Sequence, residues 1–455
     1  MNTNKERFVI NGLGGEKKLR GTIPVYGSKN AILPVMAATV LFKDEVQFSN
    51  IPHIEDVARM AELLTAMGAQ IESFSGRKMK IAGNKVSTPD LDSRLAKKMR
   101  ASVILTGSVL GRFGKMSIPH PGGCVIGARP IDLFIDGFQK MGAKVELKDE
   151  RYKFTVPGKV LKGAEIFFKM QSVTATEAFI MAGVLAKGKT VLKNVAMEPE
   201  IISLAEYLVS CGAKIKGIGS TTLEIAGTAG KLLSSKGKIY KTIPDRLEAG
   251  GFAVLAALCG DDITITGCNP ADLQIIIDLL KQSGVPIETT KNTIRVHGNG
   301  KIPNSDFKSF GFKTHEHPGF PTDVQAPMTV FLTQATGEGL VFETIFEGRL
   351  NYTQDLVRMG ADVVMWDPHR VMVKGPTALK GKELEGPDIR AGLAFVIAAI
   401  VAKGKSTIDS IYYIDRGYEK VEERLRAIGV DIQRVKVEEA AVVEIPVGTS
   451  EIIKN

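Results

Sequence analysis

A helix-ending pattern recurs six times along this chain and constrains its architecture more than any other feature. Each copy places a glycine after an amphipathic helix and before an alternating strand, as in "LLTAMGAQIE", "FQKMGAKVE" and "LVRMGADVV". The glycines are Gly68, Gly142, Gly212, Gly284, Gly360 and Gly429. Their successive separations of 74, 70, 72, 76 and 69 residues are too regular for chance and too long for a solenoid. Six related α/β units are therefore predicted.

Each of these glycines is expected to end its helix in the left-handed conformation, which costs glycine little. A second helix lies upstream in every unit and is apolar or small on nearly every side, as in "TATEAFIMAGVLA" and "RAGLAFVIAAIVA". Because a helix without a polar face has to be surrounded by protein, these segments are expected to be inner helices wrapped by sheets. The unit is predicted to run helix, strand, helix, strand, strand.

The chain of 455 residues exceeds what a single hydrophobic core usually serves. Six units divide naturally as three plus three, with a polar seam rich in Lys and Ser at residues 232–246. Two similar domains facing a cleft are therefore expected, and such clefts are favoured ligand sites. The longest apolar stretches, such as residues 391–402, fall short of the roughly 20 residues that cross a bilayer. Since the N-terminus also lacks a signal-peptide pattern, a cytoplasmic location is predicted.

The formal net charge is +9, but basic and acidic residues are interleaved along the chain and aromatic residues make up only 6%. This distribution argues against a nucleic-acid-binding protein, the main non-enzymatic alternative. A cleft that attracts phosphorylated, anionic small molecules is the simpler interpretation. Polar and charged residues indeed recur near the starts of the inner helices, where helix dipoles also favour anions. They are Lys29, Asn30, Arg100, Glu177, Asp245, Arg246, Asp323, Asp388 and Arg390.

The segment "HPGGCVIGARPIDL", residues 120–133, is not typical of a helix or a strand. Its glycine pair indicates a loop that can change shape, with Cys124 exposed on it. The other cysteines lack CxxC spacing, which argues against a disulfide framework or a zinc site. Taken singly, each acidic residue near a helix start is better explained as a helix cap. Together with Cys124 and the nearby cations, they provide a base and an acid for addition to an anionic substrate.

Other motifs do not point to a cofactor. The "GLGG" at residues 12–15 lacks the context of a dinucleotide-binding fingerprint, and no P-loop occurs in the sequence. His315 and His317 lack a third ligand at helical spacing. No metal and no cofactor are therefore predicted.

Several distinctive motifs occur in order along nearly the whole chain, among them "YGSKNAILPVMAATVL", "PGGCVIGARPIDL", "HPGFPTDVQAPM", "DIRAGLAFVIAAIVAKG" and "IDRGYEKVEERLRAIGV". They resemble the motifs of the UDP-N-acetylglucosamine 1-carboxyvinyltransferases, an enolpyruvyl transferase family. The resemblance implies an inside-out α/β barrel of two similar domains, each of three repeated units with buried inner helices. It also implies discontinuous domains, residues 1–28 with 244–455 and residues 29–243, the latter carrying the Cys124 loop. The repeat alone does not predict that crossover.

The resemblance further implies transfer of an enolpyruvyl group from phosphoenolpyruvate to the 3-hydroxyl of UDP-N-acetylglucosamine, with release of phosphate, at the start of peptidoglycan synthesis. By the same matching, Asp323 is the base for the hydroxyl, and Cys124 protonates or captures phosphoenolpyruvate. Lys29 and Arg416 complete the catalytic set. No nucleic acid, membrane or obligatory protein partner is expected.

The resemblance also gives a set of substrate-binding residues. Cations in this set would bind the charges of phosphoenolpyruvate and of the diphosphate, and polar or apolar groups would bind the sugar and the nucleotide. The residues are Asn30, Arg100, Arg129, Pro130, Ile131, Asp132, Leu133, Ser172, Val173, Ile345, Arg349 and Arg390. The chain departs from the family pattern at Gly348, Phe134 and Thr174, all on the acceptor side. An enolpyruvyl transferase with another nucleotide or phosphorylated acceptor is therefore the alternative.

Overall fold

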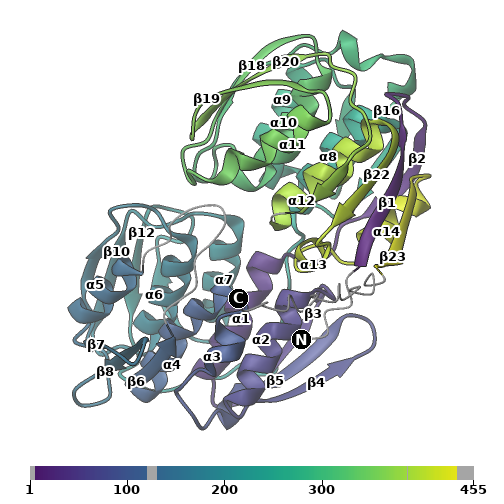
Figure 1. The fold of residues 1–455 in the computed structure, drawn as a ribbon. Coiled ribbons are helices and arrows are strands. Elements are labelled where there is room, and N and C mark those ends of the chain that lie inside the picture. The colour runs from purple at the N-terminus through teal and green to yellow at the C-terminus, as the bar shows by residue number, and fades with distance from the viewer. Residues whose placement is uncertain (1–5, 120–130, 387, 438–455) are drawn as a thin grey trace, which may run out of the picture.

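The chain forms two lobes (Figure 1), and the computed structural model describes residues 6–119, 131–386 and 388–437. The first lobe packs around apolar side chains between Ile32 and Tyr240. The second packs around those between Leu247 and Ile432, together with side chains of the N-terminal segment from Phe8 to Val25. The beginning of the chain thus lies in the lobe formed by its end.

Six buried helices occupy the interiors of the lobes, as the sequence predicts. They are α1 (Lys29–Ala38), α4 (Leu105–Phe113), α6 (Val173–Leu185), α8 (Arg246–Cys259), α10 (Gln325–Gln334) and α12 (Ile389–Val401). Packing between them is tight enough to require a glycine, because a Cβ on Gly107 of α4 would overlap the backbone oxygen of Ala178 on α6. Within the described ranges, no helix has the length and apolar character needed to cross a membrane.

Mixed and antiparallel sheets cover these helices. In the first lobe, the sheets are β13 (Ile239–Lys241), β3 (Val46–Ser49), β5 (Lys78–Ala82) and β4 (Gln70–Phe74); β6 (Lys115–Pro119), β8 (Arg151–Thr155) and β7 (Lys144–Lys148); and β11 (Lys214–Lys216), β12 (Thr222–Ala226), β10 (Lys189–Lys193) and β9 (Glu165–Phe167). In the second lobe, they are β15 (Ile287–Thr289), β16 (Thr293–His297), β14 (Gly260–Thr266) and β2 (Leu19–Pro24); β17 (Phe312–Lys313), β18 (Gly337–Phe342), β20 (Arg370–Gly375) and β19 (Asp362–Asp367); and β21 (Glu383–Glu385), β22 (Lys403–Asp409), β1 (Glu6–Leu13) and β23 (Asp431–Lys436).

One pairing scheme recurs in these sheets. Each four-stranded sheet has one parallel pair at an edge and antiparallel pairs elsewhere, as in β2 beside β14 and β14 beside β16. In the last sheet, the N-terminal strand β1 takes the place between β22 and β23. The sixth unit is thus completed by residues from the opposite end of the chain.

The outer helices end at the repeated glycines. These helices are α2 (Glu55–Ala66), α5 (Asp132–Lys140), α7 (Pro199–Ser210), α9 (Gln274–Gln282), α11 (Thr353–Arg358) and α14 (Val421–Ala427). All six glycines have positive φ, between 90° at Gly142 and 107° at Gly212. The predicted left-handed helix ends are therefore confirmed. Two shorter helices, α3 (Ser93–Ala96) and α13 (Tyr412–Asp415), lie between these units.

The chain crosses between the lobes at two places that lie side by side. Gly27 and Pro244 form an antiparallel bridge. The Ser28 N–H donates to the Ile243 carbonyl at 2.8 Å, and the Asp245 N–H donates to the Tyr26 carbonyl at 2.9 Å. The first crossing leads into α1 and the second into α8, so the helices that start each lobe begin at the same point.

Candidate active site

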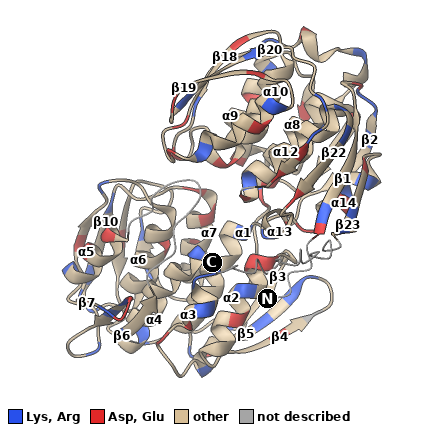
Figure 2. Cartoon of the chain, in the orientation of Figure 1, with Lys and Arg blue, Asp and Glu red and all other residues tan. Residues whose placement is uncertain are grey.

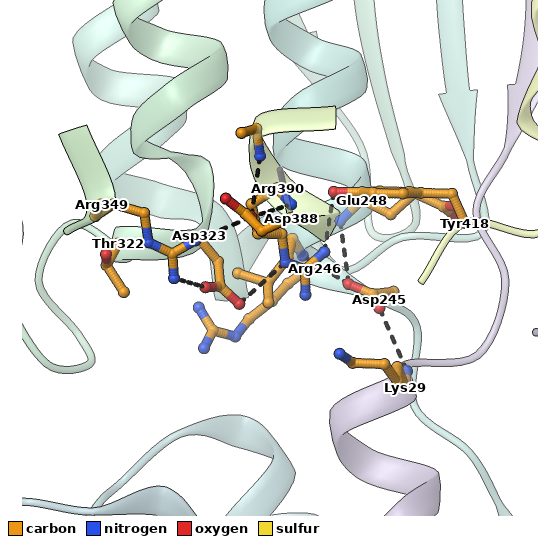
Figure 3. Close-up of polar contacts among 12 residues, drawn as sticks. Lys29, Asp245, Arg246, Glu248, Thr322, Asp323, Arg349, Asp388, Arg390 and Tyr418 are labelled. Atoms are coloured by element: carbon orange, nitrogen blue, oxygen red, sulfur yellow. Dashed lines mark hydrogen bonds and ion pairs between the residues drawn. The ribbon is translucent and has the colours of Figure 1, made fainter. Parts of the chain in front are cut away.

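Charged side chains from both lobes converge where the inner helices begin (Figure 3). Arg390 and Asp388 lie at the start of α12, Asp323 precedes α10, and Lys29 is the first residue of α1. Along the chain, basic and acidic residues alternate among the elements visible in this view (Figure 2), as the sequence indicates. The local concentration of cations, rather than the net charge, distinguishes this region.

Asp323 lies between two buried arginines. Its Oδ1 accepts a hydrogen bond from Arg349 Nη2 at 2.9 Å, and its Oδ2 accepts one from Arg390 Nε at 3.1 Å. Arg349 is 3% exposed and Arg390 is 4% exposed. Arg390 Nη1 also donates to the Tyr418 hydroxyl at 3.0 Å. A hydroxyl that approaches Asp323 therefore has to compete with two guanidinium groups for its oxygens.

Two of the other carboxylates, Asp245 and Asp388, are helix caps, which is the simpler alternative to a catalytic role. Asp245 Oδ1 accepts the N–H groups of Leu247 and Glu248 at the start of α8, at 2.9 and 3.1 Å. Asp388 caps α12 in the same way through Arg390 and Ala391. Asp245 Oδ2 additionally accepts the Lys29 N–H at 3.4 Å. One carboxylate thus lies at the first turn of a helix from each lobe.

Asp56 joins the two cations predicted to hold phosphoenolpyruvate. Arg416 of the second lobe contacts Asp56 Oδ1 through Nε at 2.9 Å, and Lys29 Nζ lies 3.5 Å from Asp56 Oδ2. Asp56 is on α2 of the first lobe and is 3% exposed. Burial lowers the pKa of Lys29 although Asp56 opposes this effect. The site therefore pairs an internal anion with cations from both lobes.

A second ion pair joins the lobes beside this one. Arg77, in the turn between β4 and β5, donates from Nη2 to Glu419 Oε1 at 2.6 Å and from Nη1 to Oε2 at 2.5 Å. The His53 N–H donates to the same carboxylate at 2.8 Å, and the Arg77 guanidinium lies 3.6 Å from the centre of the Tyr26 ring. Because Glu419 follows Arg416 by three residues, this pair also holds the segment that carries Arg416.

Replacing Arg77 with alanine is expected to lower the free energy of unfolding by about 2 kcal/mol, since it leaves the buried Glu419 carboxylate without its cation. Urea denaturation followed by circular dichroism measures the change. Arg295→Ala is the matched control because Arg295 also forms a pair of two hydrogen bonds, with Asp262 on the neighbouring strand of the same sheet, but on an exposed surface of one lobe, where the expected loss is about 0.5 kcal/mol or less. Equal stability of the two variants would argue against a tether between the lobes at Arg77.

The remaining predicted site residues have varied environments. Asn30 lies in the first turn of α1, and Arg100, which is half-buried, begins a short 3₁₀ helix. Ser172 caps α6, where its Oγ accepts the Ala175 N–H at 3.3 Å, and Val173 is the first helical residue. The others among the described residues are Ile131, which is buried, Asp132, which is exposed, Leu133, which is half-buried, and Ile345, whose N–H donates to Glu343.

Three predicted residues, Cys124, Arg129 and Pro130, lie outside the described residues. Of the positions that depart from the family pattern, Phe134 is 5% exposed and packs beside Phe179, with ring centres 6.1 Å apart. Its side chain is therefore part of the first-lobe core. Gly348 immediately precedes Arg349, so this departure adjoins the Asp323 contact.

Glu177 does not lie at a helix start, contrary to its placement among those residues. It is in the second turn of α6, is 2% exposed, and has no ion pair with any residue in the described parts of the chain. Burial raises the pKa of Glu177 well above its usual value, and the nearby Glu200 and Glu198 add to the effect. Glu200 in turn contacts Arg246 of the second lobe at 3.3 Å.

His317 lies beside the same arginine and makes stability dependent on pH. A small pocket is lined by His317, Arg246, Asp272 and the first residues of α9. Burial, with a further contribution from Arg246, lowers the pKa of His317 from 6.5 to about 4. Between these pH values the unfolded chain binds the proton more readily than the folded chain does.

The free energy of unfolding is therefore expected to decrease as the pH falls from about 6.5 to about 4. The variant His317→Gln lacks this proton-binding group, so its stability is expected to fall less over that interval. Urea denaturation of both proteins at several pH values measures the difference. Parallel stability curves for the two proteins would contradict the assignment to His317.

Sequence reasoning did not find Asp56, Tyr418 or Glu419. Asp56 had the local signal of an acidic residue at a helix start. Its partner Arg416, however, is 360 residues away. Such long-range pairs depend on the arrangement of the lobes, which no local motif indicates.

The chain is similar to known carboxyvinyltransferases. Residues 13–425 match the family described as EPSP synthase (3-phosphoshikimate 1-carboxyvinyltransferase). Proteins named UDP-N-acetylglucosamine 1-carboxyvinyltransferase from Koribacter versatilis and Solibacter usitatus are 42% and 40% identical to it. These alignments cover 94% and 95% of this chain, and 96% and 100% of those proteins.

Solved structures show the same fold. The enolpyruvyl transferase NikO from Streptomyces tendae has a TM-score of 0.84 at 20% identity, over 95% of this chain and 100% of that chain. An EPSP synthase from Acinetobacter baumannii has a TM-score of 0.71 at 18% identity, with the same coverage. The predicted α/β fold class is therefore confirmed.

Taken together, the fold, the charged side chains at the helix starts and the sequence matches define a class: the chain belongs to the EPSP synthase family of enolpyruvyl transferases and is an enzyme. Within that family, the resemblance to the UDP-N-acetylglucosamine 1-carboxyvinyltransferases is confirmed over nearly the whole chain.

Proposed function

We propose that this enzyme transfers the enolpyruvyl group of phosphoenolpyruvate to the 3-hydroxyl of UDP-N-acetylglucosamine and releases phosphate. The observation that carries the proposal is the pairing of Asp323 with Arg349 and Arg390 in a region where Lys29 and Arg416 also meet at Asp56. The names of the relatives support UDP-N-acetylglucosamine as the acceptor and a carboxyvinyl group as the group transferred. The reaction would act in peptidoglycan synthesis, in the cytoplasm.

Phosphoenolpyruvate would bind to cations from both lobes. Lys29 and Arg416 both contact Asp56, which holds the two cations in place. A substrate anion could therefore bind between Lys29 and Arg416. Arg100 would add a further positive charge from the start of its 3₁₀ helix. Closure of the lobes around the substrates would exclude water and strengthen each of these interactions.

The chemistry needs a proton donor, a base and a leaving group. A proton adds to C3 of phosphoenolpyruvate while the sugar O3 forms a bond to C2, and Asp323 accepts the proton of the attacking hydroxyl. The tetrahedral intermediate then loses a proton from C3, and the C2–O bond to phosphate breaks with its electron pair leaving on phosphate. Because Arg349 and Arg390 contact Asp323, they fix the position of its carboxylate. When the hydroxyl binds, it replaces one of these arginine contacts at an Asp323 oxygen.

Cys124 is proposed as the group that protonates or covalently captures phosphoenolpyruvate, and Arg129, five residues further along the sequence, as a cation that binds the charges of phosphoenolpyruvate. We further propose that the lobes are domains of residues 29–243 and of residues 1–28 with 244–455, arranged as an inside-out α/β barrel. The separate hydrophobic cores and the side-by-side crossings at Gly27 and Pro244 support this division.

The acceptor would lie along both lobes. Asn30 would orient the sugar, residues 129–133 would receive the uridine, Ser172 and Val173 would contact the diphosphate, and Ile345 would contact the nucleotide. Another nucleotide or phosphorylated acceptor is the second candidate, favoured by the departures at Gly348 and Thr174.

Phosphate release with a panel of acceptors tests the proposal. The purified enzyme is incubated with phosphoenolpyruvate and, separately, UDP-N-acetylglucosamine, other UDP-sugars and shikimate 3-phosphate. Turnover is expected with UDP-N-acetylglucosamine, and mass spectrometry should show the enolpyruvyl ether at O3. If phosphate were released with another acceptor but not with UDP-N-acetylglucosamine, that other acceptor would be the substrate and the proposal would be wrong.

Cys124→Ser is expected to abolish covalent capture of the epoxide antibiotic fosfomycin, as measured by intact-protein mass spectrometry. Cys211, Cys259 and Cys268 are buried, and burial raises the pKa of Cys259 to about 12 and that of Cys268 to about 11. Buried thiols in their protonated form react poorly. Labelling that persists in Cys124→Ser would contradict the proposed role of Cys124.

A further inference from the structure

Glu343 is a fully buried acidic residue that connects two segments of the site. It follows β18, and its exposed fraction is 0%. Its Oε1 accepts the N–H groups of Ile345 and Phe346 at 2.8 and 3.0 Å, and its Oε2 accepts the Thr322 hydroxyl at 2.8 Å. Among the described residues, no cation forms an ion pair with it. These three donors therefore replace the solvation that burial removes.

We propose that Glu343 is a positioning residue that aligns the acceptor hydroxyl with Asp323. The inference rests on the proposed function, because it assigns Asp323 to the sugar hydroxyl and Ile345 to the nucleotide. One oxygen of Glu343 fixes the backbone at Ile345, and the other holds the residue directly before Asp323 (Figure 3 shows Thr322 beside Asp323).

The contacts around Glu343 form a closed ring. Thr322 leads to Asp323, Asp323 bonds to Arg349 at 2.9 Å, and the Arg349 guanidinium lies 5.4 Å from the centre of the Phe346 ring. The Phe346 N–H returns to Glu343. A ring of this kind restricts both the base and the segment predicted to contact the nucleotide, so each limits the movement of the other.

The backbone of Glu343 is also held in place. Its N–H donates to the His369 carbonyl at 2.8 Å, and its own carbonyl is 2.8 Å from His369 Nδ1. The next residue, Thr344, donates its N–H to the Thr314 hydroxyl at 2.8 Å. Because the carboxylate extends from a fixed backbone, it can define the positions of Thr322 and Ile345.

The bond to Thr322 distinguishes positioning from local loop closure. The bonds to Ile345 and Phe346 span two and three residues and could close the loop alone, whereas Thr322 lies 21 residues away. The cations proposed for phosphoenolpyruvate, Lys29 and Arg416, meet at Asp56 outside this ring. Loss of Glu343 should therefore affect the sugar nucleotide more than phosphoenolpyruvate.

Steady-state kinetics of matched variants test the proposal. Glu343→Ala is expected to lower kcat/KM for UDP-N-acetylglucosamine by about 100-fold, because small misplacements of reacting groups are costly. Its KM for phosphoenolpyruvate should change by less than roughly threefold. Glu343→Gln should retain most activity, since its amide can accept the two N–H groups and donate to Thr322. Hydrogen exchange at the amides of Ile345 and Phe346 should become faster only in Glu343→Ala.

Variants at Thr322 isolate the link to the base and leave the loop bonds in place. Thr322→Val should lower kcat/KM for the sugar nucleotide by about 10-fold, and Thr322→Ser should restore it. Equal rises in KM for both substrates in Glu343→Ala, or wild-type kinetics in Thr322→Val, would overturn the proposal. If Glu343→Ala does not fold, the comparison of Thr322→Val with Thr322→Ser tests the proposal instead. A wild-type enzyme without turnover on UDP-N-acetylglucosamine would instead disprove the proposed function, so the two failures are distinguishable.

Discussion

Replacing Asp323 with asparagine is expected to lower kcat for enolpyruvyl transfer by about 10²–10⁴-fold, the range typical of a lost general base. The amide is nearly the same size as the carboxylate but cannot accept the proton of the attacking hydroxyl. Phosphoenolpyruvate affinity should change little, because Lys29 and Arg416 are held by Asp56. Phosphate release under saturating substrates measures kcat.

The control for this change is Asp262→Asn. Asp262 belongs to the same lobe and forms an exposed pair with Arg295 at 2.8 Å, so its substitution should leave kcat unchanged. A kcat in Asp323→Asn that stays within roughly threefold of wild type would exclude Asp323 as the base. A loss in both variants would indicate damage to the lobe.

Removing the side chain of Arg416 should raise KM for phosphoenolpyruvate by about 100-fold, because a charge-assisted hydrogen bond to a substrate anion is worth about 1.5–3 kcal/mol. The change also leaves Asp56 facing Lys29 alone, so the carboxylate neutralises the remaining cation. Arg416→Lys should recover part of the loss, since it restores the charge without the planar fork. Initial rates over a range of phosphoenolpyruvate concentrations measure KM.

Arg426→Ala serves as the comparison for Arg416→Ala. Arg426 lies ten residues further along, on the exposed side of α14, and its Nε donates to the Glu422 carbonyl at 3.3 Å. Its KM for phosphoenolpyruvate should equal that of wild type. A larger change in KM for the sugar nucleotide than for phosphoenolpyruvate in Arg416→Ala would contradict the assignment of Arg416.

The helices and their ends could be predicted because their signals are local. A glycine such as Gly142, with φ of 90°, follows its own helix directly, and a buried helix such as α12 is apolar over its own length. The position of β1 between β22 and β23 is different. It joins residues more than 390 positions apart, as in the pairing of Phe8 with Ile408, and the repeat contains no signal for that choice.

The residues of the candidate site also divide into those that local sequence signals predict and those that depend on long-range contacts. Lys29, Asp323 and Arg390 could be predicted because each is at or near a helix start, where backbone geometry already directs the side chain. Asp56 and Glu343 could not, because their roles depend on partners that only the folded chain brings close. Glu177 shows the limit of the helix-start argument, since one further turn along α6 places its carboxyl among buried glutamates rather than beside cations.

The shared cap at Asp245 has a consequence for how the lobes can move. Its carboxylate accepts N–H groups from the first turn of α8 and the N–H of Lys29 at the first turn of α1. A rotation of one lobe against the other therefore causes least displacement near Asp245, which acts as its fulcrum. Lys29 is next to that point and would barely shift, whereas Arg416, carried by the opposite lobe, would move away from Lys29 only if its bond to Asp56 broke.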